Sequence, residues 1–309
     1  MRLIIRYSIS VGLALLFFLG YTCKDYYAEA PPFQDEFPMD STIVILQSLP
    51  SKVKESSGII SYRDKIWTHN DSGDRPRLYE LTADGGEITR QILIEGDNED
   101  WEDITQDEAF IYVGDFGNNE GKRQDLAIYK IAKVNLLEEK DEIEAIKLDF
   151  EYPDRLDFNP PAYKHNFDCE AITSFDDSLF IFSKNYLDKQ CRVYSLSKDE
   201  SQQTARLLDK FDTKGLITGA AIDKERGVLA LLGYNLDPTL TQFGPFVWLF
   251  WDFPNHDFFK GKSKRVNLPL IAQAEGIAYW KEDKFLISTE KMRMTKGKLM
   301  VMETAQWMD

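Results

Sequence analysis

A short pattern of polar and apolar positions recurs five times along the chain. In each case a polar or small residue is followed by a small or acidic residue and then by an apolar run, as in Ser57-Gly58-Ile59, Glu102-Asp103-Ile104, Glu170-Ala171-Ile172, Ala220-Ala221-Ile222 and Glu275-Gly276-Ile277. A second apolar run and then a third, built around an aromatic residue or Met, follow each phrase. Repeats of about 45 to 70 residues with three or four short strands each are typical of β-propeller blades. The pattern therefore predicts an all-β propeller.

The fourth strand of each repeat predicts how the ring closes. Segments 88–93, 145–150, 205–208 and 265–268 each precede the next phrase, whereas the last repeat stops after its third strand near Glu303. A matching apolar segment, 42–46, precedes the first phrase instead. We expect this N-terminal strand to complete the last blade, because closure removes exposed sheet edges. The prediction is a five-bladed β-propeller, with a turn or short helix in 134–146.

The first 40 residues follow a different pattern. Arg2 and Arg6 precede an apolar run over 11–19, which is the layout of a secretory signal and is short for a membrane span. Residues 19–23 resemble a bacterial lipobox, in which Cys23 would be lipidated. A lipoprotein, an uncleaved signal anchor and ordinary secretion stay open, and all three place the mature chain outside the cytoplasm. We interpret 1–23 as the targeting segment, the acidic, proline-containing 24–40 as a tether, and 41–309 as the propeller.

Composition limits the partners. Hydrophobic residues make up 43% of the chain, enough for a packed core, and the formal net charge is −15. Nucleic acids and anionic membranes attract basic surfaces, so we expect no nucleic-acid partner and membrane contact only through the N-terminal anchor. Cys169 and Cys191 can form a disulfide in an oxidising compartment or remain separate thiols, and the sequence leaves both open.

The topology predicts where side chains gather. Strands of a blade alternate in direction, so the starts of all first strands and the loops after all second strands share one face. We expect a ring around the channel mouth made of Ser57, Glu102, Glu170 and Glu275, with Ala220 in the fifth position and Thr218 nearby. Three converging carboxylates repel unless a cation neutralises them, and oxygen ligands alone favour Ca²⁺ over Mg²⁺ or Mn²⁺. Hydrogen bonding of these side chains to backbone amides, without metal, is the alternative.

The loops on the same face supply candidate ligand-binding residues: Asp71, Arg75, Asp115, Asn118, Arg123, Lys184, Tyr234, Glu290 and Lys291. Tight turns also favour Asp, Asn and Gly. Turn chemistry does not, however, require several cations on one face of so acidic a protein, and cations beside a metal suit a phosphate or carboxylate ligand. Two insertions on this face, 152–166 and 236–245, are interpreted either as lids or as segments packed on the propeller.

Several catalytic patterns are absent from the sequence. It contains no G-x-S-x-G elbow, no Walker loop and no G-x-G-x-x-G. His165 and Cys169 lie four residues apart, but no further ligand pair has zinc spacing. A serine triad using Ser57 or Ser72 with His69 has no support beyond residue types.

The axial phrases resemble a known family. Ser57-Gly58, Trp101-Glu102, Cys169-Glu170 and Ala274-Glu275-Gly276-Ile277 are similar to the axial ring of the calcium-activated nucleotidase (apyrase) family, five-bladed propellers that bind a central Ca²⁺ through Ser and Glu side chains. Ala220 departs from that family, which has a hydroxyl residue in the fourth blade. Asn70-Asp71-Ser72-Gly73, Asp100-Trp101-Glu102-Asp103 and segment 114–119 also resemble uncharacterised cell-envelope propellers of Bacteroidetes-type bacteria, whose relatives include phytase-like and SdiA-regulated propellers.

Two functional hypotheses follow. The first is an extracytoplasmic, lipid-anchored propeller with an axial Ca²⁺ that binds a small anionic ligand of phosphoester type, with or without hydrolysis. The alternative is a non-catalytic surface propeller that acts as a scaffold for a protein or glycan. The fold class does not choose between them.

Overall fold

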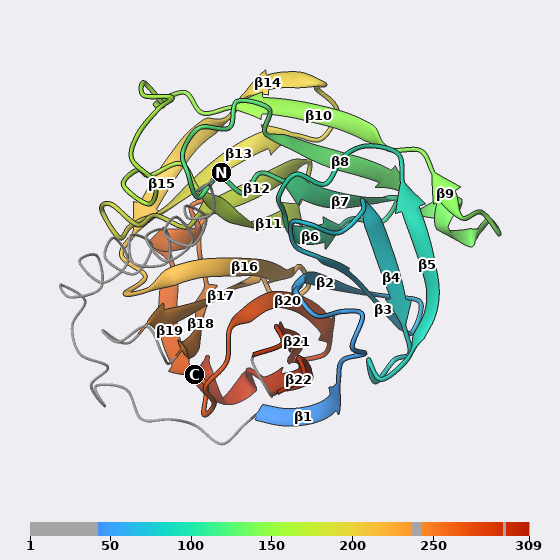
Figure 1. Ribbon diagram of the computed structural model, residues 1–309. Coiled ribbons are helices and arrows are strands. Elements are labelled where there is room, and N and C mark those ends of the chain that lie inside the picture. The colour runs from blue at the N-terminus through green and yellow to red at the C-terminus, as the bar shows by residue number, and fades with distance from the viewer. Residues whose placement is uncertain (1–42, 237–242, 293–294, 309) are drawn as a thin grey trace, which may run out of the picture.

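The computed structural model describes residues 43–236, 243–292 and 295–308. Five sheets surround a central axis as the blades of a propeller (Figure 1). The all-β, five-bladed prediction is thus confirmed. The targeting segment, Cys23 and the tether lie outside the described residues, as do Arg293 and most of the 236–245 insertion. Within the described ranges no helix has the length and apolarity needed to cross a membrane.

Each blade is built outward from an inner strand, mostly in chain order. Blade one contains β2 (Ser56–Tyr62), β3 (Lys65–Asn70), β4 (Arg77–Leu81) and β5 (Ile88–Ile94), and blade two contains β6 (Trp101–Gln106), β7 (Phe110–Asp115), β8 (Ala127–Ala132) and β10 (Ile146–Glu151). Blade three contains β11 (Cys169–Phe175), β12 (Ser178–Ser183), β13 (Cys191–Ser197) and β15 (Arg206–Phe211), and blade four contains β16 (Leu216–Asp223), β17 (Val228–Leu236), β18 (Phe243–Trp251) and β19 (Lys262–Asn267). Blade five contains β20 (Ala274–Lys281), β21 (Lys284–Thr289), β22 (Lys298–Glu303) and β1 (Ile43–Ser48).

The last blade closes as the sequence predicts. β1 pairs antiparallel with β22, with Ile43 opposite Met302 and Ser48 opposite Lys298. The N-terminal strand therefore forms the outer edge of the blade whose other three strands come from the C-terminus. This pairing joins the two ends of the described chain in one sheet.

The inner strands explain the recurring phrase. β2, β6, β11, β16 and β20 contact one another around the axis, and all eight residues of β16 are buried. Buried strands have apolar runs instead of strict alternation. Small residues permit the close approach, because a Cβ on Gly58 would lie 2.6 Å from the backbone N of Ile104, and one on Gly219 would lie 2.5 Å from the carbonyl O of Glu275.

The hydrophobic core lies between the blades. Five clusters of buried side chains in the described ranges each join one blade to the next around the ring. Trp101 of blade two, for example, shares a cluster with Ile60 and Trp67 of blade one. Truncating a buried aromatic of this size to Ala costs about 3–5 kcal/mol, so each blade depends on its neighbours.

Two short strands and three single-turn 3₁₀ helices complete the described part of the fold. β9 (Glu142–Ile143) pairs parallel with β5, and β14 (Gln202–Thr204) pairs parallel with β10. Each lies between the third and fourth strands of the next blade, so it links two blades by backbone hydrogen bonds. The 3₁₀ helix η1 (Lys133–Leu137) confirms the short helix expected in 134–146, and η2 (Phe258–Lys260) and η3 (Ala305–Trp307) are similar single turns.

The two remaining cysteines are free thiols. Cys169 and Cys191 are both buried, and no disulfide joins them. Burial raises the pKa of each thiol. Of the two alternatives from the sequence, separate thiols therefore describe the structure.

Candidate metal centre

Every inner strand has a register shift at the level of the predicted ring. The shifts lie between Ser56 and Ile59, Trp101 and Asp103, Cys169 and Ala171, Ile217 and Gly219, and Ala274 and Gly276. The residues within them are Ser57 with Gly58, Glu102, Glu170, Thr218 and Glu275. β-Bulges re-aim side chains and recur at functional sites. All four side chains predicted for the ring therefore stand at equivalent positions of their strands.

The fifth position of the ring belongs to Thr218, not to Ala220. The register shift of β16 falls at Thr218. The backbone N–H of Ala220, like that of Ile172, donates to Asp103 Oδ2, at 3.2 and 2.9 Å, which places Ala220 level with Ile172. The prediction of Ala220 was wrong because the five repeats were aligned on the apolar run Ala220-Ala221-Ile222, which shifts the fourth repeat by two residues. The fourth blade thus has a hydroxyl residue in the ring.

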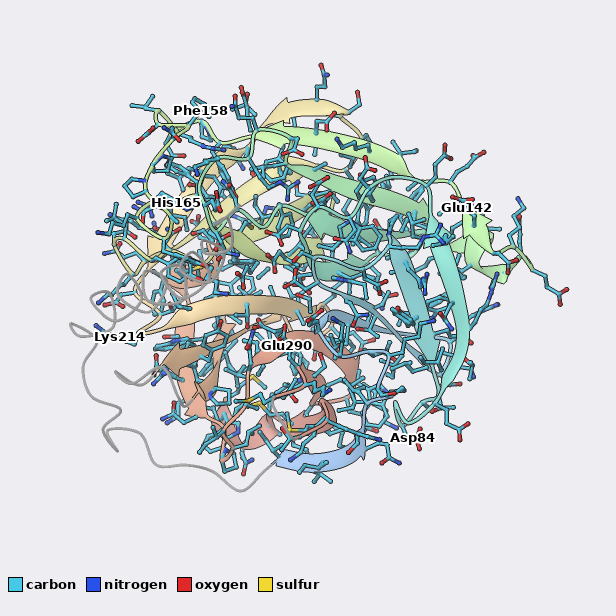
Figure 2. The ribbon with its side chains drawn as sticks, in the orientation of Figure 1. Asp84, Glu142, Phe158, His165, Lys214 and Glu290 are labelled. Atoms are coloured by element: carbon cyan, nitrogen blue, oxygen red, sulfur yellow. The ribbon has the colours of Figure 1, made fainter. Side chains whose placement is uncertain are left out.

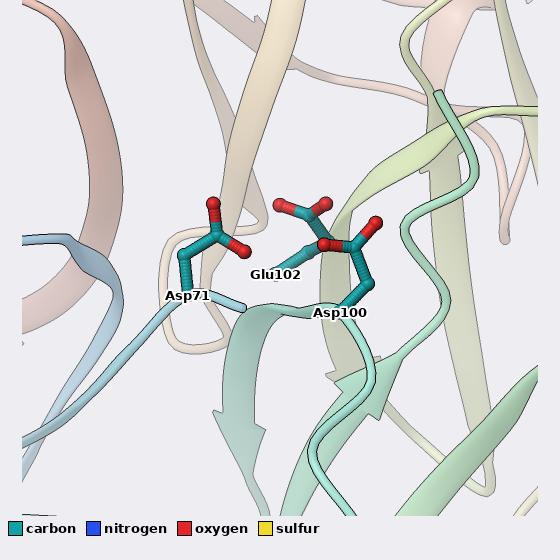
Figure 3. Close-up of side chains that lie close together, drawn as sticks. All are labelled: Asp71, Asp100 and Glu102. Atoms are coloured by element: carbon teal, nitrogen blue, oxygen red, sulfur yellow. The ribbon is translucent and has the colours of Figure 1, made fainter. Parts of the chain in front are cut away.

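Three carboxylates meet at the mouth between blades one and two. Asp71 follows β3, whereas Asp100 precedes β6 and Glu102 lies within it (Figure 3). One carboxylate oxygen from each lies within 4.8 Å of the other two. Figure 3 shows the three carboxylates turned toward a common point. This acidic triad could hold a metal ion.

Asp168 adds a fourth carboxylate beside the triad. It is 0% exposed, and its Oδ1 accepts a hydrogen bond of 2.7 Å from the backbone N–H of Asn118. Its other oxygen, Oδ2, has no hydrogen-bond partner in the described part of the chain. Its charge acts on both Asp100 and Glu102. Burying such an oxygen without a partner is costly, so this atom points to a missing ligand.

A glycine closes the triad on its outer side. A Cβ on Gly117 would lie 2.1 Å from Glu102 Oε1 and 2.3 Å from Asp100 Oδ2. The backbone can approach the carboxylates this closely only because residue 117 has no side chain. The acidic site is therefore enclosed by main chain as well as by side chains.

The electrostatics of the mouth favour a bound cation. Burial first, and neighbouring carboxylates second, raise the pKa of Asp100 to about 7 and hold the pKa of Glu102 well above its usual range. Burial likewise raises the pKa of Asp168 to about 6, of Glu275 to about 7 and of Glu290 to about 9. These carboxyl groups release their protons only against mutual repulsion, which a cation would relieve.

Lys184 places a positively charged side chain at the mouth, beside Glu170 of blade three. Its Nζ lies 2.5 Å from Glu170 Oε2, and both side chains are buried. The aromatic rings of Tyr186 and Tyr234 lie 5.9 and 5.4 Å from this ammonium group. The predicted residues Lys184 and Tyr234 thus lie together with Glu170. A buried charge is tolerated when it is paired in this way.

Three other predicted residues order the second-blade loop. A guanidinium nitrogen of Arg123 lies 2.9 Å from Asp115, and Arg123 also donates to the carbonyl of Gly117. Asp115 in turn accepts from the backbone N–H of Asp100, and Asn118 accepts from that of Arg123. Asp115, Asn118 and Arg123 therefore position Asp100 and Gly117.

The remaining predicted residues lie at the rim. Arg75 and Lys291 are exposed. Glu290 is partly buried and senses the charges of Glu275 and Asp71, and Figure 2 shows it toward the middle of the molecule. The mouth therefore has an acidic side formed by the triad and a lysine side formed by Lys184 with Glu170. Its rim includes the exposed cations Arg75 and Lys291.

The sequence reasoning missed Asp100 and Asp168. Each stands two residues before a ring glutamate, in Asp100-Trp101-Glu102 and Asp168-Cys169-Glu170. This repeated spacing was a usable signal. It places one carboxylate at the entry of the inner strand and the next at the bulge.

The histidines do not form the catalytic or zinc sites considered from the sequence. His69 is buried and contacts the Trp101 ring edge-on, and its imidazole ring has one hydrogen bond in the described chain, to the carbonyl of Asn70. Burial lowers its pKa to about 4. His165 bonds the carbonyl of Asn119 and the N–H of Phe167. No His or Cys belongs to a metal-binding group within the described ranges.

Comparisons with known proteins agree on little beyond architecture. No family model and no curated protein matches the chain. Among solved structures, it is similar to the PQQ-bound aldose sugar dehydrogenase of Streptomyces coelicolor, with 10% identity, a TM-score of 0.48, and coverage of 88% of this chain and 99% of that one. It is also similar to the Cps50 (Swd1) β-propeller domain of Myceliophteria thermophila, with 9% identity, a TM-score of 0.42, and coverage of 84% and 99%. Neither likeness assigns a family or bears on function.

Proposed function

We propose that this protein is a calcium-binding β-propeller that presents the ion, at the mouth of its central channel, to a small anionic ligand. The observation that supports this most is the meeting of Asp71, Asp100 and Glu102 beside the unpartnered Oδ2 of buried Asp168. The three carboxylates of the triad would hold the cation, the charge of Asp168 would add to the attraction, and the backbone at Gly117 would enclose the ion.

The chemistry of the candidate ligand atoms favours one class of metal ion. The candidate ligands are carboxylate oxygens, with ring hydroxyls from Ser57 and Thr218 nearby and no His or Cys. Hard oxygen donors suit Ca²⁺ and Mg²⁺, whereas zinc sites favour nitrogen and sulfur. Ca²⁺ takes six to eight oxygens in flexible geometry, which fits side chains drawn from two blades and a crossover. The ring hydroxyl in the fourth blade strengthens the likeness to the calcium-activated nucleotidases.

The anionic ligand is inferred from charge around the ion. Once bound, Ca²⁺ would polarise a phosphoryl oxygen or orient water, as metal ions do in phosphoester chemistry. The exposed Arg75 and Lys291 at the rim can contact anionic oxygens, and the ammonium group of Lys184 keeps positive charge beside the ring. Lys184 already pairs with Glu170, so its part is to balance charge rather than to clamp the ligand. A phosphoester is the ligand class that these groups fit best.

The location follows from the N-terminus. The signal-like segment 1–23, the lipobox-like sequence ending at Cys23 and the acidic tether would hold the propeller on the outside of a membrane. Millimolar Ca²⁺ outside the cytoplasm is compatible with a site of modest affinity.

Calcium titration of matched variants tests the proposal. Glu102→Gln and Asp100→Asn should each lower Ca²⁺ affinity at least about tenfold in calorimetry, because each removes a charged ligand. Glu142→Gln is the control, since Glu142 is exposed on the outer strand β9 far from the axis in Figure 2. A phosphoester panel is then screened with wild type and Glu102→Gln. Unchanged calcium affinity in both mouth variants would refute the site.

A second candidate function has its own observation. Leu156, Phe158 and Leu187 are 91%, 47% and 58% exposed, and they belong to the segments beside the lysine side of the mouth. Gathered into one patch, exposed apolar side chains of this size would form a protein- or glycan-binding surface. Binding of a surface partner that persists in EDTA and is lost in Leu156→Ser with Leu187→Ser would support this function instead.

A further inference from the structure

A cavity lies at the end of the propeller axis opposite the acidic triad. It has a volume of about 310 Å³ and is lined by the later halves of all five inner strands. The lining residues of these strands are 59–60, 104–106, 173–174, 220–222 and 277–279. The metal centre lies at the starts of these strands, so the cavity opens on the opposite face. Its size is at the lower end of small-molecule pockets.

Asp103 separates the cavity from the acidic mouth. Its carboxylate lies between the inner strands and accepts the backbone N–H groups of Ile104, Ile172 and Ala220. Ile104 and Ala220 also line the cavity, so they form its inner end directly beneath Asp103. A ligand in the cavity would therefore meet apolar side chains there, and not the carboxylates of the ring.

Two buried polar atoms in the cavity lining have no protein partner. Ser174 is 0% exposed, and its Oγ has no hydrogen-bond partner in the part of the chain that the structure describes. The Oε1 of Gln106 is likewise unpartnered, while its Nε2 already donates to the carbonyl of Ser61. Gln106 can therefore only accept, and Ser174 can donate or accept. Both atoms suit a ligand with N–H or O–H groups.

The lining at this end is acidic on balance. Asp107, Glu108 and Glu225 belong to it with one lysine, Lys224, whereas Lys133 and Lys198 contact Asp107 from outside the lining. Carboxylates therefore outnumber the ammonium group of the lining, which disfavours an anion. Ala220 and Ala221 leave room on the side of blade four, next to isoleucine walls. A rim that repels anions over an apolar interior fits a neutral ligand with an apolar body.

We propose that this cavity is a second binding site, which takes a small neutral molecule with an apolar ring and a hydroxyl or N–H donor. The donor group bonds Gln106 Oε1 or Ser174 Oγ, and the ring packs on Ile59, Ile104 and Ile277. This site does not depend on the calcium proposal, because no residue is shared between the two.

Ligand-observed NMR titration of the whole protein tests this site. The probes are tryptophol, benzyl alcohol and cyclohexanol, which are neutral ring alcohols, and indole-3-acetate is the anionic counterpart of tryptophol. We expect tryptophol to bind at least about tenfold more tightly than indole-3-acetate. Ala221→Leu, which fills the cavity, should weaken tryptophol at least about tenfold, and Ser174→Ala about three- to tenfold.

Controls separate the outcomes. Glu102→Gln should leave tryptophol binding unchanged, because that residue lies beyond Asp103. If Ala221→Leu unfolds, Ser174→Ala still tests the site, since it adds no volume. Failure of all three alcohols to bind up to their solubility would overturn the proposal. So would binding that neither cavity variant changes in folded protein.

Discussion

Asp103 shows how a single side chain holds the axis of the propeller. It is the one acidic residue among the small residues of equivalent position, Gly58, Ala171, Gly219 and Gly276. Its carboxylate accepts three backbone N–H groups, from blades two, three and four. Burial raises the pKa of Asp103, while the three amide donors oppose that rise. The residue therefore ties three blades together next to Glu102 of the acidic triad.

Removing this carboxylate should destabilise the whole ring. Asp103→Ala leaves buried amides without acceptors, and each such group costs about 1–3 kcal/mol, so we expect a loss of at least about 3 kcal/mol in urea unfolding. Asp103→Asn keeps one oxygen acceptor and should lose less. An alanine variant as stable as wild type would show that the amides find other partners.

At this scale the sequence predicted some site residues and not others. Glu102, Glu170 and Glu275 were predicted because each repeats at one place in a strong strand pattern, but only Glu102 belongs to the acidic triad, and Glu170 pairs with Lys184 instead. Asp100 and Asp168 were missed because they precede the strands, where turn chemistry equally explains an aspartate. Ala220 was assigned to the ring in place of Thr218, because the spacing of apolar residues does not reveal a β-bulge that shifts the repeat. The pairing of Lys184 with Glu170 depends on contacts across the mouth that no local pattern encodes.

At the scale of elements, the β1 strand decides whether the ring closes. It supplies the outer edge of the last blade by pairing with β22. All principal strands were predictable, because their apolar runs are long and regularly spaced. β9 and β14 were not, because strands of two or three residues pair through the backbone and have no side-chain pattern.

Deleting β1 should weaken the propeller markedly. A chain beginning at Leu49 exposes the edge of β22, which invites aggregation, whereas a chain beginning at Thr42 keeps the strand. We expect the shorter chain to melt more than about 5 °C lower or to aggregate, since 1 kcal/mol shifts the melting temperature by about 2–4 °C in domains approaching this size. Equal melting temperatures in scanning calorimetry would contradict the role of β1 in closure.

At the scale of the molecule, charge is divided between the two ends of the channel. Buried carboxylates crowd one end, and carboxylates together with a lysine line the other. The net charge of −15 predicted an acidic protein but not this division, which arises only when five strands converge. The acidic end should make stability depend on pH.

Metal-free protein should lose stability as pH rises. The pKa of Asp168 is raised to about 6, those of Asp100 and Glu275 to about 7 and that of Glu290 to about 9, above the ordinary values of the unfolded chain. The folded state thus binds more protons, and this stabilisation is complete below about pH 4 and is lost as the pH rises from there through the folded-state pKa values of about 6 to 9. The melting temperature in EDTA should fall by more than about 5 °C between pH 5 and 9. Ca²⁺ should reverse most of that fall in melting temperature. A melting temperature in EDTA that does not change between pH 5 and 9 would contradict the predicted pH dependence.

The most direct test of the metal centre is the melting temperature of residues 31–309 in EDTA and in millimolar Ca²⁺. A ligand at a hundred times its dissociation constant stabilises the folded state by about 2.7 kcal/mol. We predict a clear upward shift in Ca²⁺ that Glu102→Gln abolishes and Glu142→Gln retains. The same melting temperature in both solutions, with no Ca²⁺ retained by the purified protein, would contradict the central claim that the acidic mouth is a calcium site.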